Sequence, residues 1–251
     1  MKIKFLTLNT LHGGKMFDNL VKFVKDEKPD IAFFQEVYNG HDKSMERRFR
    51  AFEEYKKEFD FMSHAVFEPS LFDSSRGNIG WGNAVFSRFP VLSSKALFFE
   101  HPLADFSLGK GHDPYFVPRN LQCVEIDLLG KTFYGFNIHG VWDKHGDDSP
   151  SRFQMLEVVK SAIQGKSPVI LAGDTNLKPN TEFAKTIEKS LVSIFGNNLS
   201  STFNMKHKIK PGYSTAAVDM IFVSPDIKVI EKRMPDADVS DHMPLVATFN
   251  I

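Results

Sequence analysis

The sequence predicts an α/β fold in which two β-sheets pack face to face and helices cover their outer surfaces. Strand-like and helix-like segments alternate near both ends of the chain, and strand-like segments dominate the middle. Two sheets with helices outside them bury the apolar faces of both kinds of element. No Pro-, Gly- or Ser-rich linker separates the two halves, so we expect one domain over residues 1–251.

The first part of the chain is predicted to contain two strands and two helices. Apolar residues between positions 16 and 24 recur at helical spacing. The apolar run that follows them is typical of a strand buried on both faces. In the second helix, Glu46 and Arg50 are spaced for an i,i+4 ion pair, as are Glu53 and Lys57. The expected elements are strand 2–8, helix 16–24, strand 31–34 and helix 44–59.

The middle of the chain has the β-branched and aromatic composition of strands. Leu129-Gly130-Lys131 is expected to join the last two strands of this part as a tight hairpin. Residues 100–118 contain prolines and glycines, and we expect a long loop there, close to the functional site. The expected strands are 61–67, 83–87, 96–99, 121–128 and 132–138.

The last part returns to alternating helices and strands. Ser149 and Pro150 have the residue types of a helix cap and a first-turn proline. The expected elements are helix 150–163, a strand from 169, helix 180–189, and strands 218–223, 227–231 and 245–249.

The charge balance limits the classes of partner. Lys plus Arg and Asp plus Glu number 31 each, so the formal net charge is zero. Proteins that hold long duplex DNA without sequence preference usually carry excess positive charge, because neutralising phosphates drives that binding. The balanced charge argues against a processive or high-affinity DNA-binding protein, although a local basic patch would be enough for weaker binding.

The cysteine count and the apolar runs indicate the setting of the protein. Cys123 is the only cysteine, so a disulfide within the chain is impossible and the thiol is expected to be buried. The N-terminus begins with a strand instead of an apolar leader. No apolar run approaches the roughly 20 residues of a membrane span. We therefore expect a cytoplasmic monomer without a transmembrane segment.

Polar side chains lie at the ends of five apolar strands. Together they supply carboxylates, amides and an imidazole, which is the set of groups that a metal-dependent phosphoester hydrolase needs. The residues are Asn9, Glu36, Asp174 with Asn176, Asp219, and Asp241 with His242.

Three of these residues are predicted to bind a metal ion. Asn9, Glu36 and Asp241 offer oxygen ligands, and none of the motifs contributes sulfur. Mg²⁺ prefers a few carboxylates together with water and substrate phosphate, whereas zinc would favour His and Cys clusters. The expected cofactor is therefore Mg²⁺ or Mn²⁺.

The remaining residues are predicted to act on the reacting groups. Asp174 and Asn176 are two residues apart and would share a face if the strand continued past Asp174. A carboxylate there can accept a proton from water while an amide orients the nucleophile or the phosphate. Asp219 could hold one ring nitrogen of His242 and direct the other at the phosphate. His139 ends the strand 132–138 and could donate to a phosphate oxygen or to the leaving group.

Several motifs in the same order along the chain give a resemblance to a known family. The set resembles the endonuclease/exonuclease/phosphatase superfamily of metal-dependent phosphodiesterases and phosphatases, and it spans nearly the whole chain. The motifs are Asn9, Gln35-Glu36, residues 82–90 (GNAVFSRFP), Asn137-Ile138-His139, residues 173–176 (GDTN), residues 219–222 (DMIF) and residues 240–245 (SDHMPL).

The resemblance implies a four-layered α/β sandwich with the site where the loops of the two sheets meet. It implies that Asn9, Glu36 and Asp241 bind the metal, and that Asp174 and Asn176 act at the nucleophilic water and the phosphate. It also implies an Asp219–His242 pair, with the phosphate contacted by His139, Asn83 and, by a weaker match, Arg119.

Two positions depart from the family pattern. Thr175 stands where many relatives have an aromatic residue, and residues 173–177 resemble the tyrosyl-DNA phosphodiesterase variant instead. Gly140 follows His139 where a leucine is common, which affects the expected shape of that loop.

The sequence leaves the substrate open. Hydrolysis of a phosphodiester in DNA or RNA competes with hydrolysis of a small phosphoester or a phospholipid head group. Residues 205–210 (MKHKIK) form a basic segment that could contact a nucleic-acid backbone or simply be a solvated loop. A non-catalytic binding module on the same fold is the third interpretation, and the complete set of polar groups argues against it.

Overall fold

A computed structural model describes residues 1–208 and 215–251 of the chain. Ile209 and Lys210 of the predicted basic segment, with Pro211 and Gly212 after it, lie outside the described residues. None of the helices within the described ranges has the length and apolarity needed to cross a membrane.

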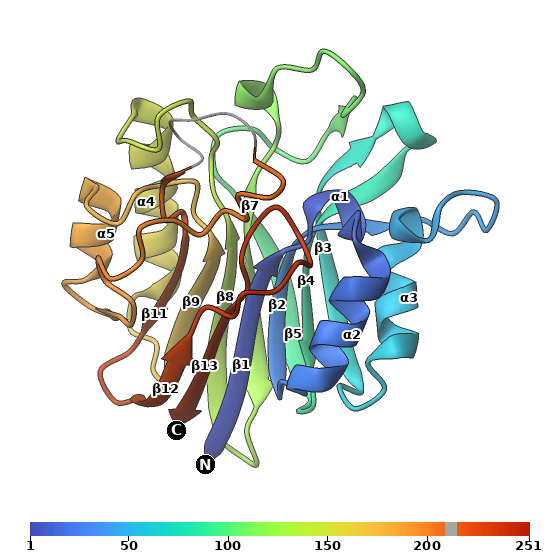
Figure 1. Cartoon of the computed structure of the whole chain (residues 1–251). Helices are drawn as coiled ribbons and strands as arrows, with labels where there is room; N and C mark the ends of the chain where they lie inside the picture. Colours follow the sequence, from blue (N-terminus) through green and yellow to red (C-terminus); the bar gives the residue numbers. More distant parts are fainter. Residues whose placement is uncertain (209–214) are drawn as a thin grey trace.

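Two mixed β-sheets form the centre of the fold (Figure 1). The seven-stranded sheet has the order β12-β13-β1-β2-β4-β3-β6, and the six-stranded sheet has the order β10-β11-β9-β8-β7-β5. The strands are β1 Lys2–Asn9, β2 Ile31–Asn39, β3 His64–Asp73, β4 Ile79–Ser87, β5 Val91–Phe98, β6 Asp105–Phe106, β7 Asn120–Asp127, β8 Thr132–His139, β9 Val169–Asp174, β10 Val192–Ser193, β11 Asp219–Val223, β12 Lys228–Arg233 and β13 Leu245–Asn250.

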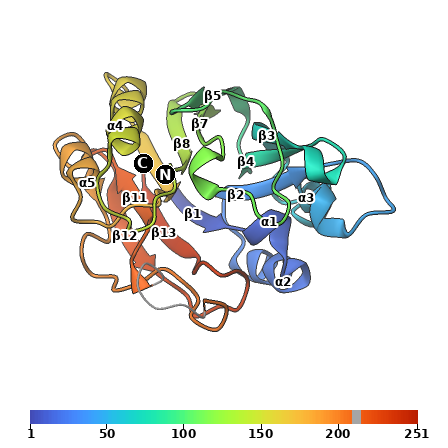
Figure 2. The same ribbon diagram turned by 90° about the horizontal axis from the view of Figure 1, so that it is seen from above.

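Helices cover the outer face of each sheet, so the predicted four-layered α/β sandwich is confirmed (Figure 2). The helices α2 and α3 pack on the seven-stranded sheet, and α4 and α5 pack on the six-stranded sheet. The two halves of the chain exchange strands, because β12 and β13 extend the sheet of β1 while β5 joins the sheet of the second half. The helices are α1 Leu11–Gly14, α2 Phe17–Glu27, α3 Ala51–Glu58, α4 Pro150–Ile163 and α5 Glu182–Ile187, with 3₁₀ turns at Arg47–Arg50, Ser74–Arg76 and Pro114–Phe116.

The helix predicted over residues 44–59 is shorter than expected. A 3₁₀ turn at Arg47–Arg50 leads into α3, and Glu46 before it is extended. The preceding loop is held by Arg50, which donates to the carbonyls of Asp42 and Met45. The predicted Glu46–Arg50 and Glu53–Lys57 pairs are replaced by Glu46–Arg48, Glu53–Lys56, Arg50–Glu54 and Glu54–Lys57.

Other boundaries also move. The strand predicted over 61–67 runs from His64 to Asp73, and the helix predicted over 180–189 is limited to Glu182–Ile187. The long loop over 100–118 contains β6 and a 3₁₀ turn, because residues 105–106 pair with the end of β3. The helix predicted over 150–163 and the hairpin at residues 129–131 are confirmed.

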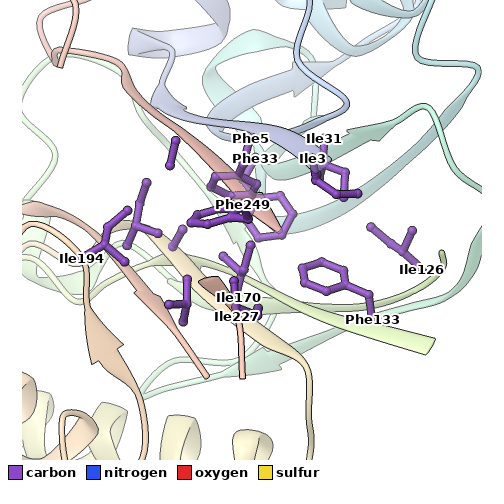
Figure 3. Packing of buried hydrophobic residues seen from close by; sticks show 14 of the residues in the cluster. Ile3, Phe5, Ile31, Phe33, Ile126, Phe133, Ile170, Ile194, Ile227 and Phe249 are labelled. Carbon is purple, nitrogen blue, oxygen red and sulfur yellow. The ribbon is translucent and has the colours of Figure 1, made fainter. Parts of the chain in front are cut away.

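The space between the sheets is apolar at the end that holds the chain termini. Figure 3 shows aromatic and aliphatic side chains from both sheets filling this region. Phe5 and Phe33 meet edge to face with ring centroids 4.9 Å apart, a favoured geometry for buried rings.

Burial raises the pKa of the half-buried Cys123 thiol on β7 to about 12, so this thiol is not a nucleophile at neutral pH.

At the opposite end the two sheets are joined by buried amides. Asn137 on β8 donates to the carbonyls of Phe34 and Ala84 in the facing sheet, each at 3.1 Å. Its own oxygen accepts from the side chain of Gln35 at 2.7 Å. Buried polar groups are tolerated when they are hydrogen-bonded in this way. The amides therefore align β2 with β8 at the end of the sandwich where the polar residues of both sheets lie.

Glu36 lies within β2, because the strand continues past it to Asn39. The pairing of β2 with β4 shifts between Phe34 and Val37, which marks a β-bulge, and Glu36 has a φ of 60°. The prediction of Glu36 at a strand end was therefore wrong. A bulge with one left-handed residue turns a side chain away from the regular alternation of the strand.

Replacing Asn137 with leucine should lower the free energy of unfolding by about 3 kcal/mol, since it leaves several buried polar groups without partners. The carbonyls of Phe34 and Ala84 would lose their donor. Urea unfolding of Asn137→Leu beside the exposed Asn198→Ala measures this. A loss as small as that of Asn198→Ala would contradict a structural role for the amide.

Candidate active site

Three neighbouring strands of the six-stranded sheet bring polar residues to one end. His139 pairs with Asp174 across β8 and β9, and Asp219 pairs with Asp174 across β9 and β11. Asp219 opens β11, because that strand runs antiparallel to β9. The three residues are thus paired in one row across neighbouring strands. The paired ends of β8, β9 and β11 lie at the end of the sandwich away from the chain termini (Figure 1).

Close backbone packing supports this row. Gly173 has a φ of 140°, and a Cβ there would lie 2.1 Å from the carbonyl oxygen of Ile138. A Cβ at Gly140 would lie 2.1 Å from the carbonyl oxygen of Thr175. Thr175 is buried and donates to the carbonyl of Val218 at 2.8 Å. The two departures from the family pattern, at 140 and 175, are therefore in direct contact.

The row continues into the loop before β13. His242 Nδ1 lies 2.8 Å from Asp219 Oδ2, and His242 Nε2 lies 3.9 Å from Asp174 Oδ2. All three side chains are buried. The ring of Phe203 meets the His242 ring edge on, with centroids 4.7 Å apart. The predicted Asp219–His242 pair is present as a hydrogen bond. The two ring nitrogens of His242 thus face two different carboxylates.

The charges in this group affect one another strongly. Burial would lower the pKa of His242, but Asp219 and Asp174 raise it well above its usual value, so the ring is cationic. Burial raises the pKa of Asp174, and the nearby Asp219 adds to this effect. His242, Asn9 and the Asn176 backbone oppose the rise. Asp174 is therefore a stronger proton acceptor than an ordinary carboxylate.

Glu36 and Asp241 are two further acidic residues of the site, and the charge of Asp241 acts on Glu36. Burial would raise the pKa of Glu36, but the charges of His12 and Arg119 lower it below its usual value. Burial would likewise raise the pKa of Asp241, and His242 and Lys208 lower it. Both carboxylates are ionised at neutral pH. The donor set therefore suits a hard divalent cation.

Asn9 connects Glu36 with Asp174. Its side-chain nitrogen donates to Glu36 Oε1 at 3.1 Å and to Asp174 Oδ2 at 3.0 Å, while its oxygen accepts from the Leu11 amide at 3.1 Å. The predicted metal-ligand role requires the amide oxygen to face the carboxylates. In this structure the nitrogen faces them, so of the three predicted ligands Glu36 and Asp241 present carboxylate oxygens and Asn9 presents its amide nitrogen.

Asp174, Asp219 and His242 also lie close enough to hold a cation, with their ligand atoms within 4.8 Å of one another. The imidazole argues against this alternative. Its Nδ1 already binds Asp219, and a protonated ring has no lone pair for a metal. The ionised carboxylates of Glu36 and Asp241 therefore suit a cation better than this cluster does.

His139 and Arg119 lie on the other side of Asp174. His139 Nε2 is 3.6 Å from Asp174 Oδ2 and 3.9 Å from Glu36 Oε1. The Arg119 guanidinium donates to the His139 ring at 2.9 Å and lies over the Trp81 ring. Burial and the Arg119 charge hold the pKa of His139 well below its usual value, so this ring is neutral.

Asn83 and Asn176 lie differently from expectation. Asn83 lies within β4, and its nitrogen donates to Asn120 and to the Asn137 carbonyl, which makes it part of the buried amides between the sheets. The strand β9 ends at Asp174, so Asn176 sits in a turn with a φ of 55° and donates to the Gly140 carbonyl at 3.0 Å. The condition stated for a shared face, a strand that continues past Asp174, is therefore not met.

Several residues of the site were not predicted from the sequence. The His12 amide donates to Glu36 Oε2 at 2.8 Å, from the tight turn α1 in which residues 11–14 all have positive φ. In the sequence, the Gly13-Gly14 pair after the first strand was the feature that could have indicated this turn. Arg152 is buried in α4 and donates to the carbonyls of Val141, Asp143, Asp147 and Asn176, joining the loop after His139 to the turn after Asp174.

Comparisons with known proteins identify the family of this chain. A model of the Endonuclease/Exonuclease/phosphatase family matches residues 6–242. A Caenorhabditis elegans protein named "Putative neutral sphingomyelinase" is 24% identical over 168 residues, which are 63% of this chain and 35% of that protein. The chain thus spans about a third of the length of that curated relative.

Solved structures share the fold at low identity. An endonuclease/exonuclease/phosphatase from Beutenbergia cavernae has a TM-score of 0.78 at 15% identity, covering all of this chain and 72% of that one. A mannosyl-6-phosphatase from Bacteroides thetaiotaomicron has a TM-score of 0.70 at 18% identity, covering 99% and 100%. Humanized D. rerio TDP2 has a TM-score of 0.69 at 17% identity, covering 100% and 99%.

Gly140→Ala should destabilise the protein by roughly 2 kcal/mol or more, since the added methyl meets the Thr175 backbone and must displace it. Turnover should fall as well, because His139 and Asn176 adjoin this contact. Gly130→Ala is the control: φ there is 90°, nothing lies within 4 Å of the added carbon, and only backbone strain of about 1 kcal/mol is expected. Thermal unfolding and activity of both variants measure the difference, and equal losses would contradict the packing argument.

Proposed function

Because the chain belongs to the endonuclease/exonuclease/phosphatase family, we propose that it is a Mg²⁺- or Mn²⁺-dependent hydrolase of phosphoester bonds, acting as a phosphodiesterase or nuclease. One observation carries the proposal. At one end of the sandwich Asn9 donates to both Glu36 and Asp174. His242 lies between Asp174 and Asp219, with Asp241 next to it in the chain. Groups of these kinds can activate water and stabilise the charge that develops on phosphate.

Asp174 is the proposed base. Its raised pKa favours taking a proton from water, and Asn9 and the Asn176 amide hold its two oxygens in place. The attacking oxygen would form a bond to phosphorus in line with the leaving oxygen, whose bond to phosphorus breaks. Asp174 would hold the proton of the water until the product leaves.

The two histidines have different proposed roles. His242 is cationic and held by Asp219, so its Nε2 side can donate to a phosphate oxygen as negative charge builds there. His139 is neutral and receives a hydrogen bond from Arg119, whose positive guanidinium would lie beside a phosphate bound at this end of the sandwich. Both arrangements supply charge without rearrangement during the reaction.

Glu36 and Asp241 would hold the divalent cation, together with Asn9 if its amide presents the oxygen. When bound, the cation would supply charge that stabilises the phosphate and the leaving oxygen. With the cation bound, Asp174 would still orient the water, and His242 and His139 would still orient the phosphate.

A small phosphoester or a phospholipid head group is the second candidate substrate. The 24% identity to the sphingomyelinase-named protein and the zero net charge both favour it. DNA or RNA is favoured by the fold shared with D. rerio TDP2, one structure of which holds a single-stranded DNA product. A panel of plasmid DNA, single-stranded DNA, bis-p-nitrophenyl phosphate, inositol phosphates and sphingomyelin tests both candidates. If the protein hydrolyses none of these substrates, the proposal is overturned.

Hydrolysis should stop in EDTA and return with Mg²⁺ or Mn²⁺, since the proposed ligands are carboxylate oxygens. Glu36→Gln should raise the metal concentration needed for half-maximal activity by at least about tenfold, because one ionised ligand becomes neutral. The exposed Glu231→Gln is the matched control and should behave like the unmodified protein. Full activity of the unmodified protein in EDTA would rule out metal dependence.

Asp219→Asn and His242→Ala should each reduce turnover on the order of 10²-fold or more. Because the two groups act as a unit, the double variant should be scarcely worse than the worse single variant. Turnover is measured beside thermal unfolding, with His64→Ala at the far end of β3 as control. Multiplicative losses in the double variant would show that the two residues act separately, and a loss of stability without a loss of turnover would assign them a structural role.

A further inference from the structure

Lys208 contacts one of the two proposed metal-binding carboxylates. Its ammonium nitrogen lies 2.7 Å from Asp241 Oδ2, and the two side chains are 29% and 12% exposed. The ammonium also lies 4.7 Å from the centre of the Phe203 ring, the same ring that meets His242. The cation of Lys208 is therefore part of the site, although the sequence suggested only a solvated or nucleic-acid-binding loop.

The loop around Lys208 is anchored to the segment that carries Asp241. The Asn204 amide donates to the Asp241 carbonyl at 2.8 Å, and its side chain donates to the Ser240 carbonyl at 3.0 Å. Asn204 and His207 both bind Asp238 Oδ1. These contacts fix the position from which the lysine side chain reaches Asp241.

We propose that Lys208 is a built-in counter-cation of Asp241, which Mg²⁺ or Mn²⁺ must displace to bind there. The inference rests on the proposed function, since it takes Asp241 as a metal ligand. An ammonium at 2.7 Å occupies one of the two carboxylate oxygens of Asp241, and its charge repels a divalent ion that approaches either oxygen. Lys208 thereby sets the metal concentration at which the site is loaded.

Metal binding in the absence of substrate tests this directly. Free Mn²⁺ is measured by electron paramagnetic resonance during titration of the full chain and of Lys208→Met, with Lys208→Gln as a second neutral variant. Removing the competing charge should lower the Kd for Mn²⁺ by about three- to fivefold, the upper part of the range expected for a partly exposed ion pair. Lys208→Arg keeps the charge and should stay within about twofold of the unmodified protein.

Lys206→Met is the matched control, because it removes the same charge from an exposed position two residues away. Its Kd should equal that of the unmodified protein. Unchanged or weaker Mn²⁺ binding in both neutral Lys208 variants, with normal binding in the unmodified protein, would overturn this inference alone. If the unmodified protein binds no Mn²⁺, the metal site of the proposed function fails and this inference fails with it.

Discussion

The hydrogen bonds of the buried Asn137 amide are the interaction on which the rest of the site depends. They cross from β8 to the carbonyls of the facing sheet and to Gln35, immediately before the bulge at Glu36. Two sheets that met only through apolar side chains could slide relative to one another at little cost. A directional amide fixes their register, and with it the position of Glu36 relative to His139, two residues beyond Asn137.

Two of the central strands were predictable because β2 and β9 begin with runs of apolar residues, 31–34 and 169–172, that need burial on both faces. The polar residues predicted for the site could be identified because each one adjoins an expected apolar strand. Glu36 was placed at a strand end because a bulge with a positive φ at a non-glycine residue has no residue signature. The orientation of the Asn9 amide and the contact of Lys208 with Asp241 depend on tertiary packing, which spacing along the chain does not encode.

The electrostatics divide the site into two parts with different chemistry. In one part, burial and like charge make Asp174 a stronger base while Asp219 keeps His242 cationic. In the other part, nearby positive groups keep Glu36 and Asp241 ionised despite burial. Asn9 lies between them and donates to a carboxylate of each part. This difference is the basis for proposing that proton transfer and cation binding use separate carboxylates.

The position of a bound metal tests this division most directly. A crystal of the protein soaked in Mn²⁺ and measured at the manganese absorption edge gives an anomalous difference peak at the ion. The peak should lie between Glu36 and Asp241, with His242 still hydrogen-bonded to Asp219. A single peak among Asp174, Asp219 and His242 would contradict the division, because the proposed base and the cationic imidazole would then be metal ligands.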